Sequence, residues 1–440
     1  MANSRPRARE GGIIIGTLNP GPNNAITDVP GVLVGQATLI RGEGVLHPGR
    51  GPVRTGVTAI LPHGGNLFRE KVKAASFVLN GFGKTIGLVQ IDELGTLETP
   101  ILLTNTLNVG RVADALIDHM LEENPEIGVT TGTVNPVVAE CNDGFLNDLQ
   151  GRHVGREEVR EAIRTAAGGP VKEGSVGAGT GMSAFGFKGG IGTSSREIGP
   201  QAGGYLVGTL ALANFGRREE LVVAGVPVGR VLKDWRPEGE PEGDQGTGTG
   251  LTRDRIPLRP KTPGTKPGQE RGAEGHRSVQ AGTASPVAVS RPLTGGVGGP
   301  ENGQGNGPGT GPGDGSIIIV VATNAPLSSR QLGRLARRAV LGLARTGSTA
   351  SNGSGDIVLA FSTAHRISHY ADEKVLLGEG LPEGNRYFGP LFQAVIESTE
   401  ESILNALFRA ETMVGRDGNI RYALPLERVL EILQRFPREV

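Results

Sequence analysis

The sequence predicts a mixed α/β protein whose strands and helices alternate on both sides of a long glycine- and proline-rich segment. Short β-branched runs bounded by Gly or Pro, such as 56–62, are typical of buried strands. Other stretches, such as 107–122, place apolar residues three and four positions apart, which is the spacing of an amphipathic helix. The part after residue 315 has only two clear strands, so we expect them to pair with upstream strands in one shared sheet.

The individual elements follow from these two patterns. Upstream, the sequence predicts strands at 25–35, 56–62 and 221–227 and helices at 107–122 and 156–167. Downstream, it predicts strands at 316–323 and 357–362 and helices at 328–344, 388–410 and 426–434. The first downstream helix begins with Ser328, a residue type that commonly caps helix N-termini.

The segment at about 236–315 consists of Gly, Pro and polar residues without apolar periodicity. Such a composition buries too little apolar surface to offset the entropy of ordering, so we expect a disordered insertion. Residues 1–235 and 316–440 would then be two parts of a single domain.

The charge balance favours a small partner molecule. The 440 residues include 45 Lys and Arg and 45 Asp and Glu, so nothing in the net charge attracts nucleic acid or an anionic membrane. No apolar run approaches the length of a membrane helix, and the stretch at 13–15 is too short for the core of a signal peptide. Cys141 is the only cysteine, so no internal disulfide can form, and we expect a buried thiol in a cytoplasmic protein.

The junction between Gly315 and Ser316 is the strongest candidate for chemistry. Cleavage there would place a serine with a free amine first on a buried strand. Serine needs a base to act as a nucleophile, and a terminal amine with a pKa of about 7.7 to 8.0 can serve as that base. Gly315 lacks a Cβ and can take the strained backbone that an attack within the chain requires. The ordinary alternative is a loop that ends at a strand beginning with Ser.

Other chemistries fit the sequence poorly. Residues 179–184 match a G-x-G-x-x-A dinucleotide fingerprint with Glu197 as the ribose acid, but the flanks do not have the required strand and helix. A phosphate-binding loop at 83–85 lacks the upstream Gly, because position 78 is Val. His365 and His369 are four residues apart without the Glu that a zinc protease needs. We therefore expect neither a cofactor nor a metal.

Several motifs resemble those of the L-aminopeptidase/D-esterase family, which includes the β-aminopeptidases. The motifs lie at 140–148, 176–182, 188–190, 213–216, 315–327 and 353–357, and the likeness spans about 25–424 apart from the insertion. The resemblance implies a precursor that cleaves itself before a serine into a long and a short chain. It also implies a four-layer αββα sandwich that resembles the N-terminal nucleophile hydrolases with a different connectivity.

The resemblance also implies an activity and an assembly. Members of the family release N-terminal residues from small peptides, amides and esters, and they assemble from several cleaved two-chain units. The acyl residue released here, α-L, D or β, stays open, as do the oligomeric state and any trimming of the insertion. An acyltransferase of the ornithine acetyltransferase type shares the self-cleaving logic and is the alternative, although its nucleophile is threonine.

The family's catalytic roles transfer to residues near the junction. By resemblance, Ser316 is the nucleophile, and Asn214 is the amide that stabilises the oxyanion. Ser354 and Asp356 match the serine and the acidic residue that orient the nucleophile and stabilise its ammonium group.

The substrate-binding candidates lie at 140–145. Glu140 and Asp143 are carboxylates able to hold the substrate amine, but Asn142 and Asp143 could equally form an Asx turn before Gly144. One branch of the family has an assisting tyrosine where this chain has Phe145, so that hydroxyl is absent or replaced from elsewhere. The glycine run at 174–192 either brings backbone close to the site or allows tight packing between sheets.

Overall fold

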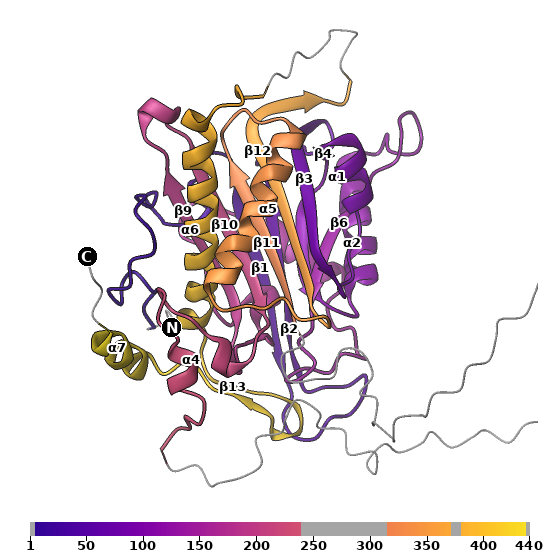
Figure 1. Ribbon diagram of the computed structural model, residues 1–440. Coiled ribbons are helices and arrows are strands. Elements are labelled where there is room, and N and C mark those ends of the chain that lie inside the picture. Colours follow the sequence, from indigo (N-terminus) through magenta and orange to yellow (C-terminus); the bar gives the residue numbers. More distant parts are fainter. Residues whose placement is uncertain (1–4, 239–314, 371–379, 437–440) are drawn as a thin grey trace, which may run out of the picture. The chain divides into compact units, whose positions relative to one another are not determined.

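The computed structural model describes residues 5–238, 315–370 and 380–436 (Figure 1). Nearly all of the expected insertion lies outside these residues. Within the described ranges, no helix combines the length and apolarity needed to cross a membrane.

A six-stranded sheet carries both sides of the candidate junction. Its strands, in spatial order, are β4 (Thr96–Leu97), β3 (Glu70–Gly81), β12 (Gly355–Ser368), β11 (Ser316–Thr323), β10 (Leu206–Asn214) and β9 (Gly190–Glu197). β11 pairs in parallel with β12 and antiparallel with β10, and β12 pairs antiparallel with β3. The strands after the junction therefore complete a sheet begun by strands before it.

A second, four-stranded sheet contains β1 (Leu33–Arg41), β2 (Val53–Leu61), β5 (Ile101–Asn105) and β6 (Val137–Cys141), in that order. Two short hairpins accompany the sheets: β7 (Ser183–Ala184) with β8 (Phe187–Lys188), and β13 (Met413–Val414) with β14 (Ile420–Arg421). The helices are α1 (Leu88–Leu94), α2 (Val109–Glu123), α3 (Arg156–Arg164), α4 (Val228–Val231), α5 (Ser329–Arg345), α6 (Asn385–Arg409) and α7 (Leu426–Arg435).

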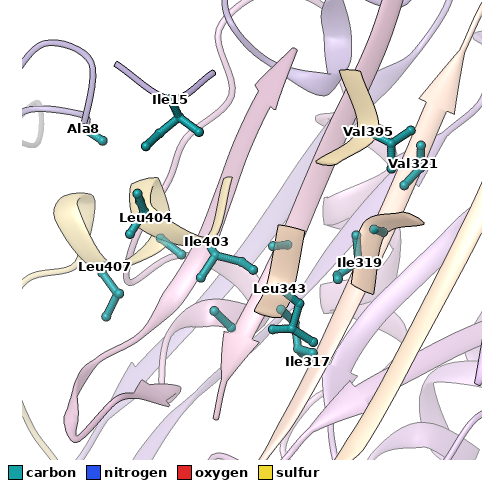
Figure 2. Close-up of a cluster of buried hydrophobic side chains, with 14 of the residues drawn as sticks. Ala8, Ile15, Ile317, Ile319, Val321, Leu343, Val395, Ile403, Leu404 and Leu407 are labelled. Atoms are coloured by element: carbon teal, nitrogen blue, oxygen red, sulfur yellow. The ribbon is translucent and has the colours of Figure 1, made fainter. Parts of the chain in front are cut away.

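Three apolar clusters define the layers of the fold. In the first, α5 and α6 cover one face of the six-stranded sheet, and side chains such as Leu343 and Ile403 of the helices share a buried cluster with Ile317 and Ile319 of β11 (Figures 1 and 2). The second cluster fills the space between the two sheets, and the third lies between the four-stranded sheet and helices α2 and α3. The order is helix, sheet, sheet, helix, so the predicted αββα sandwich is confirmed.

Most predicted elements are present with shifted ends. β11 has the predicted bounds, and Ser328 caps α5 by accepting a hydrogen bond from the backbone N–H of Gln331. The strand predicted at 25–35 begins only at Leu33, after a 3₁₀ turn. The strand predicted at 221–227 is wrong. Ala224 and Gly225 have φ angles of 50° and 83°, so the chain reverses there in a tight turn.

Candidate active site

Ser316 lies at the first position of β11, with its neighbours at the adjacent strand ends. It faces Asn214, the last residue of β10, and Gly355, the first residue of β12. Residues directly opposite in an antiparallel pair place their side chains on the same face of the sheet, so the Ser316 hydroxyl and the Asn214 amide share a face. Ser316 is only 4% exposed, so its hydroxyl occupies a largely dehydrated position.

The Gly315–Ser316 peptide is held against a backbone donor. The Gly355 N–H donates to the Gly315 carbonyl at 3.1 Å and lies 3.3 Å from Ser316 Oγ. A Cβ on Gly315 would lie 2.2 Å from the carbonyl oxygen of Asn214, which no side chain could tolerate. Position 315 therefore requires glycine for steric reasons. The Gly355 N–H polarises the Gly315 carbonyl that Ser316 would attack.

The orientation of the Asn214 amide is fixed by its neighbour. The backbone N–H of Ser183 donates to Asn214 Oδ1 at 2.8 Å. Since the oxygen is taken, the amide nitrogen is the group left to donate, and it has no acceptor among the described residues. An N–H donor beside a serine nucleophile is the element that an oxyanion site needs.

Ser354 and Asp356 form a hydrogen-bonded pair beside the nucleophile strand. The Ser354 hydroxyl donates to Asp356 Oδ1 at 2.6 Å. Burial raises the pKa of Asp356 to about 6, although hydrogen bonds from Ser354 and from the backbone of Ile317 favour the ionised form. Within the described part of the chain, the other carboxyl oxygen, Oδ2, is buried without a partner. A carboxylate in this state can accept a cation.

The raised pKa of Asp356 predicts a pH-dependent stability in the uncleaved chain. The folded state binds this proton more tightly than the unfolded state, whose Asp pKa is about 3.9. The resulting stabilisation is therefore lost as the pH rises from about 4 through about 6. We compare the double variant Ser316→Ala/Asp356→Asn with the single variant Ser316→Ala. The unfolding midpoint of the double variant minus that of the single variant should increase as the pH rises over this window. The difference should then level off. A pH-independent difference in denaturation curves would contradict the assignment.

Glu140 lies near the end of β6, one residue before Cys141, and is 1% exposed. Its Oε1 accepts a hydrogen bond from the backbone N–H of Lys84 at 2.9 Å and lies 3.8 Å from the Lys84 ammonium. Burial raises the pKa of Glu140. Its Oε2 is buried and has no partner in the described ranges, so this carboxylate can take one more hydrogen-bond donor.

Two contacts bring Glu140 to the nucleophile end of β11. The thiol of Cys141 donates to the Ser316 carbonyl at 3.3 Å, so β6 lies directly against the start of β11. Gly83 precedes the Lys84 that binds Glu140. It packs closely on Gly355, because a Cβ added to Gly355 would lie 2.7 Å from the Gly83 Cα. Glu140 therefore approaches the site from the side of β12.

The other candidates at 142–143 occupy different environments. Asn142 is exposed, and its Oδ1 accepts the Gly144 N–H at 2.9 Å, which is the Asx turn that the sequence left open. Asp143 is fully buried and accepts hydrogen bonds from Asn105 and Asn147, both at 3.0 Å. Burial raises the pKa of Asp143 to about 7. Each carboxylate keeps one buried oxygen without a partner in the described ranges, Oδ2 of Asp143 and Oε2 of Glu140. Glu140 differs in its position, because it lies beside Lys84 and next to Gly83, which packs on Gly355.

The glycine run at 174–192 brings backbone segments into direct contact. A Cβ on Gly179 would lie 2.5 Å from the Ile191 nitrogen, and one on Gly189 would lie 2.4 Å from the Ala213 oxygen, next to Asn214. Lys188 is fully buried, and its ammonium donates to the carbonyls of Gly179 and Gly189 at 3.0 and 2.8 Å. Close backbone packing thus holds the loop whose Ser183 N–H orients Asn214.

Sequence reasoning missed three side chains around the site. Lys188 could have been found from its position in the Lys-Gly-Gly motif. Ser183 and Arg421 carry no local signal: the Nε of Arg421 donates to Ser183 Oγ at 3.1 Å across 238 residues of sequence. The Phe145 ring packs against the same guanidinium, whose carbon lies 3.4 Å from the ring centroid, so this position supports a cation.

The alternative chemistries find no geometric support. Residues of the dinucleotide-like motif form a 3₁₀ turn, Gly177–Gly179, and the short strand β7, so the motif neither follows a sheet strand nor opens a helix. Among the residues with described positions, no cluster of three His, Cys, Asp or Glu side chains could hold a metal ion.

A serine that begins a central strand of an αββα sandwich, beside an amide donor, defines the class of hydrolases with an N-terminal nucleophile fold. The comparisons agree. The sequence pattern of peptidase family S58 matches residues 24–421. Beta-peptidyl aminopeptidase BapA of Sphingosinicella microcystinivorans is 40% identical over 98% of this chain and 93% of its own length. The BapA of Sphingosinicella xenopeptidilytica is 37% identical, with 98% and 92% covered.

Solved structures extend the match to three dimensions. The PH0078 protein from Pyrococcus horikoshii OT3 is 48% identical with a TM-score of 0.78, covering 98% of this chain and all of its own. The L-aminopeptidase D-Ala-esterase/amidase from Ochrobactrum anthropi, described as a prototype of the serine aminopeptidases and a variant of the Ntn hydrolase fold, is 33% identical with a TM-score of 0.75, covering 99% of this chain and all of its own. The chain belongs to peptidase family S58 and is a serine aminopeptidase.

Proposed function

We propose that the chain cleaves itself between Gly315 and Ser316 and that Ser316 is then the nucleophile of the aminopeptidase. The observation that carries this proposal is the Gly355 N–H, which donates to the Gly315 carbonyl and lies 3.3 Å from Ser316 Oγ. The products would be a long chain, 1–315, and a short chain, 316–440, that remain one domain through the shared sheet.

The cleavage is an attack of Ser316 Oγ on the Gly315 carbonyl carbon. The Oγ–C bond forms as the hydroxyl proton passes to the departing Ser316 nitrogen, and the C–N bond breaks to leave an ester. Water then hydrolyses the ester, which frees the Gly315 carboxylate and the Ser316 hydroxyl. The Gly355 N–H stabilises the oxyanion that develops on the Gly315 oxygen.

The released amine then acts as the base in substrate hydrolysis. It takes the proton of Ser316 Oγ during acylation and returns it to the leaving amine. Asn214 Nδ2 and the Gly355 N–H stabilise the oxyanion. The unpaired oxygen of Asp356 is available to the ammonium of Ser316, since the backbone of the adjacent Ile317 lies close enough to this carboxylate to lower its pKa, against the larger effect of burial. Water then hydrolyses the acyl-enzyme, so the cycle uses no cofactor.

Glu140 is the group we assign to the ammonium of the substrate. It has an unused carboxylate oxygen at the nucleophile end of β11, and an aminopeptidase needs a negative charge there. The substrates we infer are short peptides, amides and esters with a free N-terminal amine, including those that begin with a β-amino residue, because two relatives are named beta-peptidyl aminopeptidases. We also propose that the protein is cytoplasmic, which the lone buried Cys141 supports. Several cleaved two-chain units are proposed to assemble into an oligomer.

Intact mass and a substrate panel test this function together. The purified protein should give two chains with masses for 1–315 and 316–440, allowing for trimming of the long chain. It should hydrolyse p-nitroanilides of α-L, D and β-homo amino acids to different extents, and it should not hydrolyse their N-acetyl derivatives. One intact chain with full activity would rule out the self-cleavage mechanism, and equal hydrolysis of the N-acetyl compounds would rule out recognition of the amine.

A further inference from the structure

Arg421 on β14 lies beside the oxyanion donor. Its Nε donates to Ser183 Oγ at 3.1 Å, and the N–H of the same Ser183 donates to Asn214 Oδ1 at 2.8 Å. The guanidinium carbon lies 3.4 Å from the ring centroid of Phe145, so one flat face is fixed against an aromatic surface. A hydrogen bond and a stacked ring together hold this side chain in one orientation.

This cation has no anionic partner in the described part of the chain. Burial, and to a smaller extent the nearby cation Arg218, lowers the pKa of Arg421 to about 10. Arg218 donates to the backbone carbonyls of Trp235 and Gly186, and the carboxylates of Asp234 and Glu219 partly offset its charge. A partly buried guanidinium beside a second positive charge is costly unless an anion neutralises it.

Glu140, with its one unused oxygen, and the Arg421 guanidinium lie on opposite flanks of the nucleophile. Glu140 reaches the start of β11 from the side of β12, through Lys84 and Gly83. Arg421 reaches it from the side of β10, through Ser183 and Asn214. Because β11 lies between β10 and β12, a substrate on Ser316 would have a carboxylate at one end and a guanidinium at the other.

We propose that Arg421 binds the C-terminal carboxylate of a short peptide substrate, and that this contact favours peptides with a free carboxylate over their amides. The proposal rests on the proposed function, in which Glu140 holds the N-terminal ammonium. A planar guanidinium with two outer nitrogens matches a carboxylate in the bidentate manner, and the remaining Nε stays on Ser183. The leaving amino acid is then held by its carboxylate while its nitrogen is protonated.

The test compares a dipeptide with the amide of the same dipeptide. In the wild-type enzyme, kcat/KM should be higher for the free acid. In Arg421→Met, the acid-to-amide ratio of kcat/KM should fall by about 10- to 100-fold, mainly through a higher KM for the acid. Arg421→Lys keeps the positive charge but lacks the two outer guanidinium nitrogens, so its acid-to-amide ratio of kcat/KM should lie between those of the wild type and Arg421→Met. Arg428→Met, which removes an exposed arginine of α7, is the matched control and should leave the ratio unchanged.

Two results would overturn the proposal: equal kcat/KM for acid and amide in the wild type, or an unchanged ratio in Arg421→Met. The wild-type comparison decides the question even where Arg421→Met fails to fold. A p-nitroanilide without a carboxylate separates this proposal from the proposed function. Its hydrolysis by the wild type supports the aminopeptidase mechanism, whatever the acid-to-amide ratio.

Discussion

Ser316→Ala is expected to keep the protein as one chain of 45.7 kDa and to abolish hydrolysis. Alanine lacks the hydroxyl that attacks the Gly315 carbonyl, so no free amine forms at position 316 and both the nucleophile and its base are lost. The fold should remain, because the missing oxygen is one small contact at the strand end while β11 keeps its pairing with both neighbours. Denaturing electrophoresis, intact mass and p-nitroanilide hydrolysis measure these effects.

Two companion variants make the result specific. Ser316→Cys supplies another nucleophile and should still cleave, at a different rate. Ser76→Ala removes a half-buried hydroxyl of β3 in the same sheet, which donates to Asp92, and should cleave and hydrolyse as the wild type does. Cleavage that persists in Ser316→Ala would place the scissile bond elsewhere, and hydrolysis that persists in the uncleaved variant would exclude Ser316 as the nucleophile.

Asn214→Ala is expected to lower kcat by about 10²- to 10³-fold, because the loss of one oxyanion donor typically costs this much. The substitution also leaves the half-buried Ser183 N–H without its acceptor, which costs at most about 1–3 kcal/mol of stability, the range for a fully buried group. Kinetics on the cleaved fraction and thermal unfolding separate the two effects.

Asn214→Asp separates the donor role from a structural one. Aspartate keeps an oxygen for the Ser183 N–H but replaces the donating nitrogen with a second, negatively charged oxygen. If Asn214 stabilises the oxyanion, Asn214→Asp should lose at least as much kcat as Asn214→Ala while folding more stably. Near-normal kcat in Asn214→Asp would mean that Asn214 only holds the loop that contains Ser183.

The sequence predicted best those features that depend on residues adjacent in the chain. The change from a glycine-rich segment to a β-branched run marked Ser316, and β11 has the predicted bounds. Helix α5 and its Ser328 cap also follow from local signals. The strand predicted at 221–227 failed because apolar composition does not reveal a turn whose residues have positive φ angles.

Only part of the candidate site could be predicted from the sequence. Asn214, Ser354 and Asp356 were assigned through short motifs at strand ends, and their closeness to Ser316 depends on the order and register of β10, β11 and β12. Glu140 and Asp143 looked equivalent in the sequence because both are carboxylates in one short motif. They differ in the fold, since Asp143 accepts from the amides of Asn105 and Asn147, whereas Glu140 accepts from the backbone N–H of Lys84, next to the Gly83 that packs on Gly355.

Propensity, periodicity and motif chemistry are properties of neighbouring residues, so the amino-acid sequence alone indicated the α/β pattern of the chain, the change of composition at Gly315 and the residue types able to act there. Tertiary structure alone decided that a single N–H of Gly355 serves both the Gly315 carbonyl and the Ser316 hydroxyl, and that Ser183 fixes the Asn214 amide. It also brought Arg421 and Phe145 together at this site. These contacts join residues far apart in the chain, so they exist only once sheet register and packing have fixed the distances between them.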